Sequence, residues 1–327
     1  MAVGLGEELA RGSRSAVFAW GREAVAKVPF RSTPDGWIHY EALYTEAVYE
    51  AGAPAPELLG IETVDNRPAS IYKRVGGSSM WEHIVEVPGS ISAHARTLAE
   101  LQAYLTTLVT PVSLPAMRDR LSAKIRVAAR RRGASLLDAL NAMPAQLPTR
   151  LCHGDLHPGN VIMGRDGPVI IDWFDVSRGD PTADVARTGL LLSVVRHGAA
   201  GPKHLAGAGP EIVERTKRAY LAAADELLAP DPDELRRWDA VAAVARLAEG
   251  LDSEDLLAAW NDWRVATWPR AASRADARTL VPAGERSGSV LDDQAQVVEH
   301  RRRGGDHEAV VLRTRQLDDG AGLVGDQ

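Results

Sequence analysis

Short apolar runs alternate with turn residues over the first 76 positions, and this pattern predicts a small β-rich unit that contains one helix. Gly21 separates two apolar runs as in a β-hairpin, and Gly52, with two prolines soon after it, marks the end of a helix. The predicted elements are strands at 16–20, 24–28, 57–63 and 69–75 and a helix at 37–51.

Helical spacing of apolar residues dominates from about residue 92 onwards. The predicted helices cover 92–108, 118–140, 181–195, 210–228, 233–247 and 253–268, and short strands are predicted at 150–153, 161–163 and 169–171. The basic run of the second helix is typical of a solvated face. Residues 269–327 have scattered apolar positions, which predicts a disordered tail. We therefore predict an α+β fold of two lobes, a β-rich one over 1–76 and a larger, mainly helical one over 77–268.

Composition narrows the class of protein. The chain has 327 residues, of which 45% are hydrophobic and 25% charged, as in ordinary globular proteins. The net charge of −6 argues against a nucleic-acid partner, since such proteins usually carry a basic excess. One cysteine, Cys152, allows no internal disulfide and suits a reducing compartment. No signal peptide and no run long enough to span a membrane is apparent, so we expect a cytoplasmic protein without a membrane partner.

The densest chemistry lies between Cys152 and Asp172. Asp155 and Asn160 are five residues apart on one tight loop, and Asp172 follows a predicted turn and strand. Such an arrangement suits phosphoryl transfer, because one carboxylate can meet an acceptor hydroxyl while an amide oxygen and a second carboxylate bind Mg²⁺.

These residues also carry a resemblance. His153-x-Asp155-x4-Asn160 resembles the catalytic loop of protein-kinase-like folds, and His-Gly-Asp-Leu-His-Pro-Gly-Asn resembles the form found in the aminoglycoside phosphotransferase and choline-kinase-like family. The resemblance extends over about residues 5 to 265. It implies that Asp155 is the catalytic base or orients the hydroxyl, and that Asn160 and Asp172 hold Mg²⁺. His153 would brace the loop, and His157 would contact the γ-phosphate.

The resemblance also implies a nucleotide site in the first lobe. Lys27 closes a strand as the phosphate-pairing lysine of such folds does, and Glu41 on the next helix would form an ion pair with it. Glu46 is the competing partner. The loop around Ser13 has one glycine and would meet phosphate oxygens through its backbone N–H groups.

The interlobe hinge is the third part that the resemblance implies. Tyr72-Lys73-Arg74-Val75 resembles the segment whose backbone pairs with the purine edge, which places Lys73 and Val75 at the nucleotide. Because that contact uses the main chain, ATP and GTP remain equally open. Further along, Asp180 is predicted to cap a helix that begins at Pro181, and Asp184 would bond to the catalytic-loop backbone.

The sequence thus predicts a small-molecule kinase that transfers the γ-phosphate of ATP or GTP to a substrate hydroxyl, with Mg²⁺ as cofactor. One alternative is a catalytically weak nucleotide-binding regulator on the same fold, and another is a metallohydrolase that uses His153, Asp155 and His157. The acceptor stays open. Several acidic residues could form a cleft for a cationic acceptor, but we favour their being ordinary surface charge. They are Asp231, Asp233, Glu234, Glu249, Asp252, Glu254 and Asp255.

Overall fold

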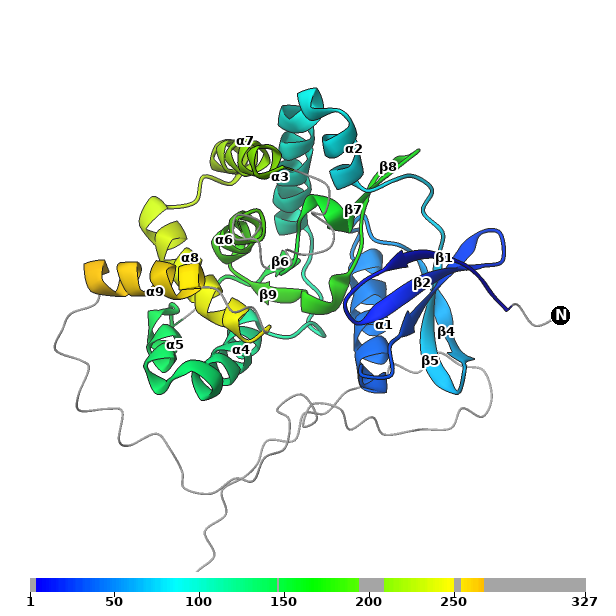
Figure 1. Cartoon of the computed structure of the whole chain (residues 1–327), viewed down its shortest axis with the longest axis horizontal. Coiled ribbons are helices and arrows are strands. Elements are labelled where there is room, and N and C mark those ends of the chain that lie inside the picture. Colours follow the sequence, from blue (N-terminus) through cyan, green and yellow to red (C-terminus); the bar gives the residue numbers. More distant parts are fainter. Residues whose placement is uncertain (1–3, 146, 194–208, 250–253, 268–327) are drawn as a thin grey trace, which may run out of the picture. The chain divides into compact units, whose positions relative to one another are not determined.

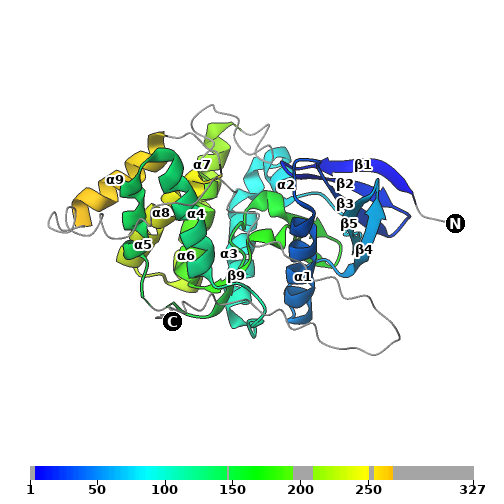
Figure 2. The ribbon, with the colours of Figure 1, turned by 90° about the horizontal axis from the view of Figure 1, so that it is seen from below.

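A five-stranded antiparallel sheet forms the N-terminal part of the chain. The computed structural model describes residues 4–145, 147–193, 209–249 and 254–267. The sheet has the order β1-β2-β3-β5-β4 (Figures 1 and 2). Its strands are β1 (Leu5–Arg11), β2 (Ser15–Trp20), β3 (Ala24–Pro29), β4 (Leu58–Val64) and β5 (Arg67–Lys73).

The predicted hairpin is present as β2 and β3. The two strands pair from Ser15 opposite Pro29 to Trp20 opposite Ala24, and Gly21 takes the positive φ of 67° that the turn requires. Lys27 lies on the central strand, opposite Val17 on one side and Ser70 on the other. The strand β1 was not predicted, because all seven of its residues are exposed and leave no apolar pattern.

Helix α1 (Asp35–Glu50) follows the prediction and packs on the sheet at β4 and β5. It buries Ile38, Ala42 and Val48, and also the carboxylate of Glu41. Gly52 ends the helix with a φ of 91°, as expected of a glycine that follows a C-terminus. Figures 1 and 2 both show α1 beside the sheet.

The rest of the described chain is mainly helical, with two short strand pairs. The helices are α2 (Met80–Glu86), α3 (Ile91–Thr107), α4 (Met117–Arg132), α5 (Asp138–Ala142), α6 (Pro181–Leu191), α7 (Pro210–Leu228), α8 (Pro232–Leu247) and α9 (Glu254–Thr267). The strand pairs are β6 (Arg150–Cys152) with β9 (Ser177–Gly179), and β7 (Val161–Gly164) with β8 (Gly167–Ile170). The second pair is the predicted hairpin between the catalytic loop and Asp172.

One prediction in this region needs correction, and one helix was missed. The helix predicted over 118–140 is wrong as one element, because Gly133 adopts a φ of 128° and separates α4 from a 3-10 turn and α5. The short helix α2 was missed, although Ser79 and Glu82 form the capping box that begins it. The prediction for 269–327 lies outside the described residues.

Two apolar cores support the helical part. One joins α2, α3 and α7 to the loop after β6 and contains Trp81, Leu98 and Trp173, and the other joins α4, α6, α8 and α9 around Trp238 and Trp260. Cys152 is fully buried in the second core, as expected of a small apolar residue. Within the described segments, no helix is long and apolar enough to cross a membrane.

Candidate functional site

Lys27 joins two carboxylates from distant parts of the chain. Its Nζ donates hydrogen bonds to Glu41 on α1 and, at 3.2 Å, to Oδ1 of Asp172. Glu46, the competing partner, is exposed on the same helix. Burial acts to lower the pKa of Lys27, but Asp172 and Glu41 outweigh it and raise that pKa, so the ammonium stays charged. Lys27 in turn is the main cause that lowers the pKa of Asp172.

A tight turn after β8 sets the position of Asp172. The residue has a left-handed backbone with a φ of 65°, which is uncommon outside glycine but tolerated by aspartate. The next residue, Trp173, is fully buried, and its indole nitrogen donates to the carbonyl of Ile170 at 2.8 Å. This buried side chain therefore fixes the turn that presents the carboxylate to Lys27.

Helix α6 and β8 hold the loop that carries Asp155. Asp184 accepts hydrogen bonds from the backbone N–H groups of His153 at 3.1 Å and Gly154 at 2.8 Å, as predicted. Asp180 caps the same helix by accepting from the N–H of Thr182, which is also as predicted. On the other side, Nε2 of His153 lies 3.2 Å from the carbonyl of Ile171.

Gly154 allows the loop to pass close to the turn after Asp172. Its φ is 78°, and a Cβ atom at this position would lie 2.3 Å from the carbonyl oxygen of Asp175. Both the backbone conformation and the space therefore require glycine directly before Asp155.

Asp155, His157 and Asn160 lie together within the loop. Nδ2 of Asn160 donates to the carbonyl of Asp155 at 2.9 Å and lies 3.5 Å from its Oδ2, so the amide oxygen faces away from this carboxylate. His157 is buried, its Nδ1 accepts from the N–H of Gly159 at 3.0 Å, and its Nε2 is 4.0 Å from Oδ2 of Asp155. Burial raises the pKa of Asp155, against the lowering effect of Arg187.

The residues near Asp172 fit a magnesium ion better than zinc. The carbonyl of Asn160 accepts from the N–H of Ile171 at 2.9 Å, so Asn160 and Asp172 lie at the same end of the β7–β8 hairpin. One amide oxygen and one carboxylate are the partial ligand set with which Mg²⁺ binds phosphates and water. No group of three or more His, Cys, Asp or Glu side chains that could hold a metal occurs in the described part of the chain.

The other predicted nucleotide contacts lie around the sheet. Ser13 is in the exposed bend between β1 and β2. Lys73 ends β5, where its backbone N–H donates to the carbonyl of Glu57 at 2.9 Å and its Nζ donates to the carboxylate of the same residue at 3.0 Å. Val75 is partly buried in the segment between β5 and α2, against Gly164 of β7. The side chain of Lys73 is therefore engaged at Glu57.

An aromatic stack connects α1 to the turn after Asp172. The rings of Trp37 on α1 and Phe174 are stacked with centroids 4.3 Å apart. The guanidinium of Arg14, from the loop after β1, covers Trp37 at 4.2 Å, and that of Arg120, from α4, lies 5.6 Å from Phe174. The helix that carries Glu41 is thus held against the turn that carries Asp172.

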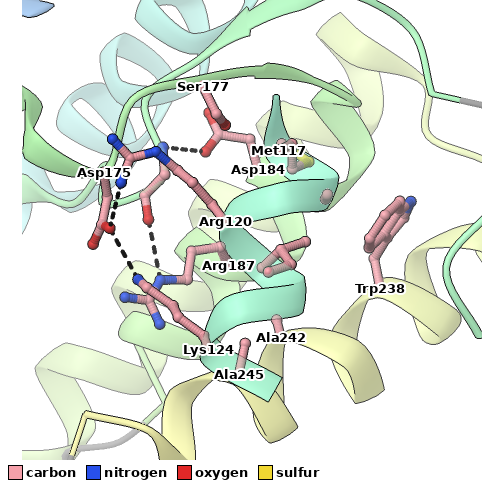
Figure 3. Close-up of a pocket in the computed structure, with 13 residues that line it drawn as sticks. Met117, Arg120, Lys124, Asp175, Ser177, Asp184, Arg187, Trp238, Ala242 and Ala245 are labelled. Atoms are coloured by element: carbon pink, nitrogen blue, oxygen red, sulfur yellow. Dashed lines mark hydrogen bonds and ion pairs between the residues drawn. The ribbon is translucent and has the colours of Figure 1, made fainter. Parts of the chain in front are cut away.

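A buried network of charged side chains adjoins Asp155, and sequence reasoning missed it. Arg187 on α6 donates to Oδ1 of Asp155 at 3.2 Å and to Glu249 at 2.9 Å. Lys124 on α4 donates to Asp175 at 3.0 Å and to Glu249 at 3.2 Å. Figure 3 shows Lys124 and Arg187 on the side of a pocket where Asp175 lies.

Two sequence interpretations are corrected by this network. The solvated-face interpretation of the basic run holds for Arg126 and for 130–132, which are exposed, but is wrong for Arg120 and Lys124. Glu249 is not surface charge, since its side chain is 18% exposed and three cations lower its pKa to about 2 against the effect of burial. Asp231 and Asp233 are exposed, as expected.

Arg187 itself could have been found from the sequence. It follows Asp184 by three residues on one helix and therefore shares the face that meets the catalytic loop. Thr188 on the same face donates to the carbonyl of Leu156 at 2.9 Å.

The fold has counterparts among solved structures. The crystal structure of an aminoglycoside-3'-phosphotransferase of type VIII is 21% identical, with a TM-score of 0.52, over 76% of this chain and 93% of that one. The apo form of a thermostable mutant of aminoglycoside phosphotransferase APH(4)-Ia is 20% identical, with a TM-score of 0.55, over 80% of this chain and 94% of that one. Both confirm the predicted two-lobed α+β fold.

A search of curated proteins gives no significant match. The family model described as phosphotransferase enzyme family (APH) matches residues 7–227, which include Lys27, Glu41, Asp155, Asn160 and Asp172. The match covers more than half of the sequence and confirms the resemblance of the catalytic loop. The chain belongs to the phosphotransferase enzyme family.

Proposed function

We propose that this chain is a small-molecule kinase that transfers the γ-phosphate of ATP or GTP to a substrate hydroxyl. The observation that carries the proposal is the contact of one half-buried ammonium, that of Lys27, with Glu41 and with Asp172, 145 residues further along. Asp172 in turn lies at the hairpin end that also carries Asn160. A cation, a Mg²⁺ ligand set and a carboxylate base are the parts that phosphoryl transfer needs.

The nucleotide would lie between the sheet and the β7–β8 hairpin. Lys27, oriented by Glu41, would pair with the α- and β-phosphates, and the backbone N–H groups near Ser13 would meet phosphate oxygens. The purine edge would face the main chain of the segment that contains Lys73 and Val75. ATP and GTP are both proposed, since a main-chain contact of this kind leaves the choice to local geometry.

Asp155 is proposed to receive the proton of the acceptor hydroxyl. The hydroxyl oxygen forms a bond to the γ-phosphorus, the bond from that phosphorus to the β-phosphate oxygen breaks, and the proton passes to Asp155. Mg²⁺, held by Asn160 and Asp172, would supply positive charge to the phosphates. We propose His157 as a second catalytic-loop residue, in contact with the γ-phosphate and beside Oδ2 of Asp155.

The identity of the acceptor stays open, and we propose a cytoplasmic location for the protein. Both similar structures are named as aminoglycoside phosphotransferases, but at 20–21% identity they support the fold and leave the acceptor open. A cytoplasmic location fits the supply of nucleoside triphosphate and Mg²⁺ that the proposed reaction requires.

The test is nucleotide turnover with and without acceptors. ATP and GTP consumption in the presence of Mg²⁺ would be measured for the wild type and for Asp155→Asn, first without acceptor and then with alcohols, sugars, amino alcohols and aminoglycosides. The loss expected for Asp155→Asn is about 10²- to 10⁴-fold, because its amide cannot accept the proton. Asp166→Asn, an exposed aspartate in the β7–β8 turn, is the matched control.

Three outcomes of this experiment distinguish a kinase from a nucleotide-binding regulator and test the role of Asp155. A large loss in Asp155→Asn together with normal turnover in Asp166→Asn supports the kinase. A loss below about threefold at unchanged folding rejects the role of Asp155. Tight nucleotide binding without turnover in the wild type would instead identify the chain as a nucleotide-binding regulator.

A further inference from the structure

A pocket of about 50 Å³ lies next to the catalytic loop, among helices α4, α6 and α8. One of its sides is apolar and includes Met117, Trp238 and Ala242, while Lys124 and Arg187 belong to the other (Figure 3). Gly154, the residue directly before Asp155, also lines the pocket. A group bound here would lie close to the proposed catalytic carboxylate.

Positive charge exceeds carboxylate charge around this pocket. The charged residues that line it are three cations, Arg120, Lys124 and Arg187, and two carboxylates, Asp175 and Asp184. Beyond the lining, Arg246 pairs with Glu249. Asp175 already pairs with Arg120 and Lys124, and Asp184 accepts from two backbone N–H groups of the catalytic loop. A cationic acceptor would therefore have to displace one of these donors before it met a carboxylate.

Two of the arginines keep donor groups that the described residues do not use. The Nε–H groups of Arg120 and Arg246 are buried without a hydrogen-bond partner in the described part of the chain. Arginine has only donors, and its guanidinium matches carboxylates and phosphates. Buried donors of this kind, beside a pocket with excess positive charge, indicate an anionic ligand.

We infer that the acceptor of the proposed kinase is a small hydroxyl compound that carries an anionic group, a carboxylate or a phosphate, and not a cationic aminoglycoside. This inference rests on the proposed function. The anionic group would bind Lys124 and Arg120 at the pocket, and the hydroxyl would meet Asp155. The cations have a second effect, because they offset the repulsion between an anionic acceptor and the γ-phosphate.

Acceptors with a common carbon skeleton and different charge test the inference. One series is glycerol, glycerate, glycerol 3-phosphate and 2-amino-1,3-propanediol, and a second is glucose, glucuronate, glucose 6-phosphate and glucosamine, with kanamycin as a polycationic acceptor. The rate of nucleotide consumption above the acceptor-free rate gives kcat/KM for each. We expect the anionic members to exceed the neutral ones by about tenfold or more, as one desolvated charge pair allows. Comparison of the carboxylate acceptors with the phosphate acceptors shows which anionic group is preferred.

Two variants of helix α4 test whether the preference for anionic acceptors depends on the cations at the pocket. Lys124→Gln removes one cation from the pocket, and Arg126→Gln removes one from the exposed face of α4. The ratio of kcat/KM for anionic and neutral acceptors should fall in the first variant and stay unchanged in the second. Melting temperatures of both variants show whether folding is intact.

Every outcome separates this inference from the proposed function. If amines or neutral alcohols react as well as the anionic members, the inference is wrong while the kinase stands. An anion preference that persists in Lys124→Gln also overturns it. Absence of any nucleotide turnover, with and without acceptor, refutes the proposed function itself.

Discussion

Replacing Glu249 by glutamine would remove the carboxylate on which the cluster beside Asp155 is centred. Glu249 follows α8, and its side chain is 18% exposed. Its Oε1 accepts from Arg187 at 2.9 Å and from Lys124 at 3.2 Å, and Arg246 pairs with its other oxygen. Glutamine keeps the shape of the side chain but leaves these three cations without their common partner.

The expected loss follows from the pKa of this carboxyl. Burial alone would raise the pKa, but Arg187, Lys124 and Arg246 lower it from 4.5 to about 2. One pKa unit corresponds to about 1.4 kcal/mol, so the ionised Glu249 contributes about 3 kcal/mol to the free energy of unfolding at neutral pH. Because the folded pKa lies below the unfolded one, this contribution is complete above about pH 4.5 and disappears as the pH falls towards 2.

Urea unfolding of the wild type and Glu249→Gln at pH 7 and pH 3.5 measures this contribution. The difference in the free energy of unfolding should be about 3 kcal/mol at pH 7 and about 2 kcal/mol at pH 3.5. Glu62→Gln, at an exposed position of β4, is the control and should change little at either pH. A loss of the same size at both pH values would show that shape and packing, not the ion pairs, set the role of Glu249.

Three further predictions concern the site. Lys27→Met should weaken nucleotide binding, measured by calorimetry, by about tenfold or more, because it removes a charge-assisted contact. Lys73→Met should leave the affinity unchanged, and equal effects of the two variants would contradict the role of Lys27. Gly154→Ala should lower the free energy of unfolding by about 2 kcal/mol or more in urea, because its φ and the nearby carbonyl exclude Cβ, whereas Gly89→Ala has open space and should not. Trp37→Leu should cost about 1 kcal/mol from lost stacking, and no loss on thermal unfolding would refute a stabilising stack.

The parts of the site that the sequence predicted are those set by local structure. Asp155 and Asn160 share one short loop, and a β-hairpin with a two-residue turn connects that loop to Asp172. The three residues are therefore close in sequence and close in space. The resemblance implied that Glu41 pairs with Lys27, with Glu46 as the competing partner, and α1 does turn Glu41 towards Lys27. The relation of Asp155, Asn160 and Asp172 needs only loop and hairpin geometry, which short sequence patterns determine well, whereas the Lys27–Glu41 pair was expected from the resemblance.

The charged cluster could not be predicted in the same way, because it depends on how distant helices pack. Two basic residues of α4, Lys124 and Arg126, are two positions apart, yet one contacts a carboxylate after α8 while the other is exposed. Their sequence surroundings do not distinguish them, since both occur in one basic run. The difference arises from the packing of α4 on α8, about 120 residues later.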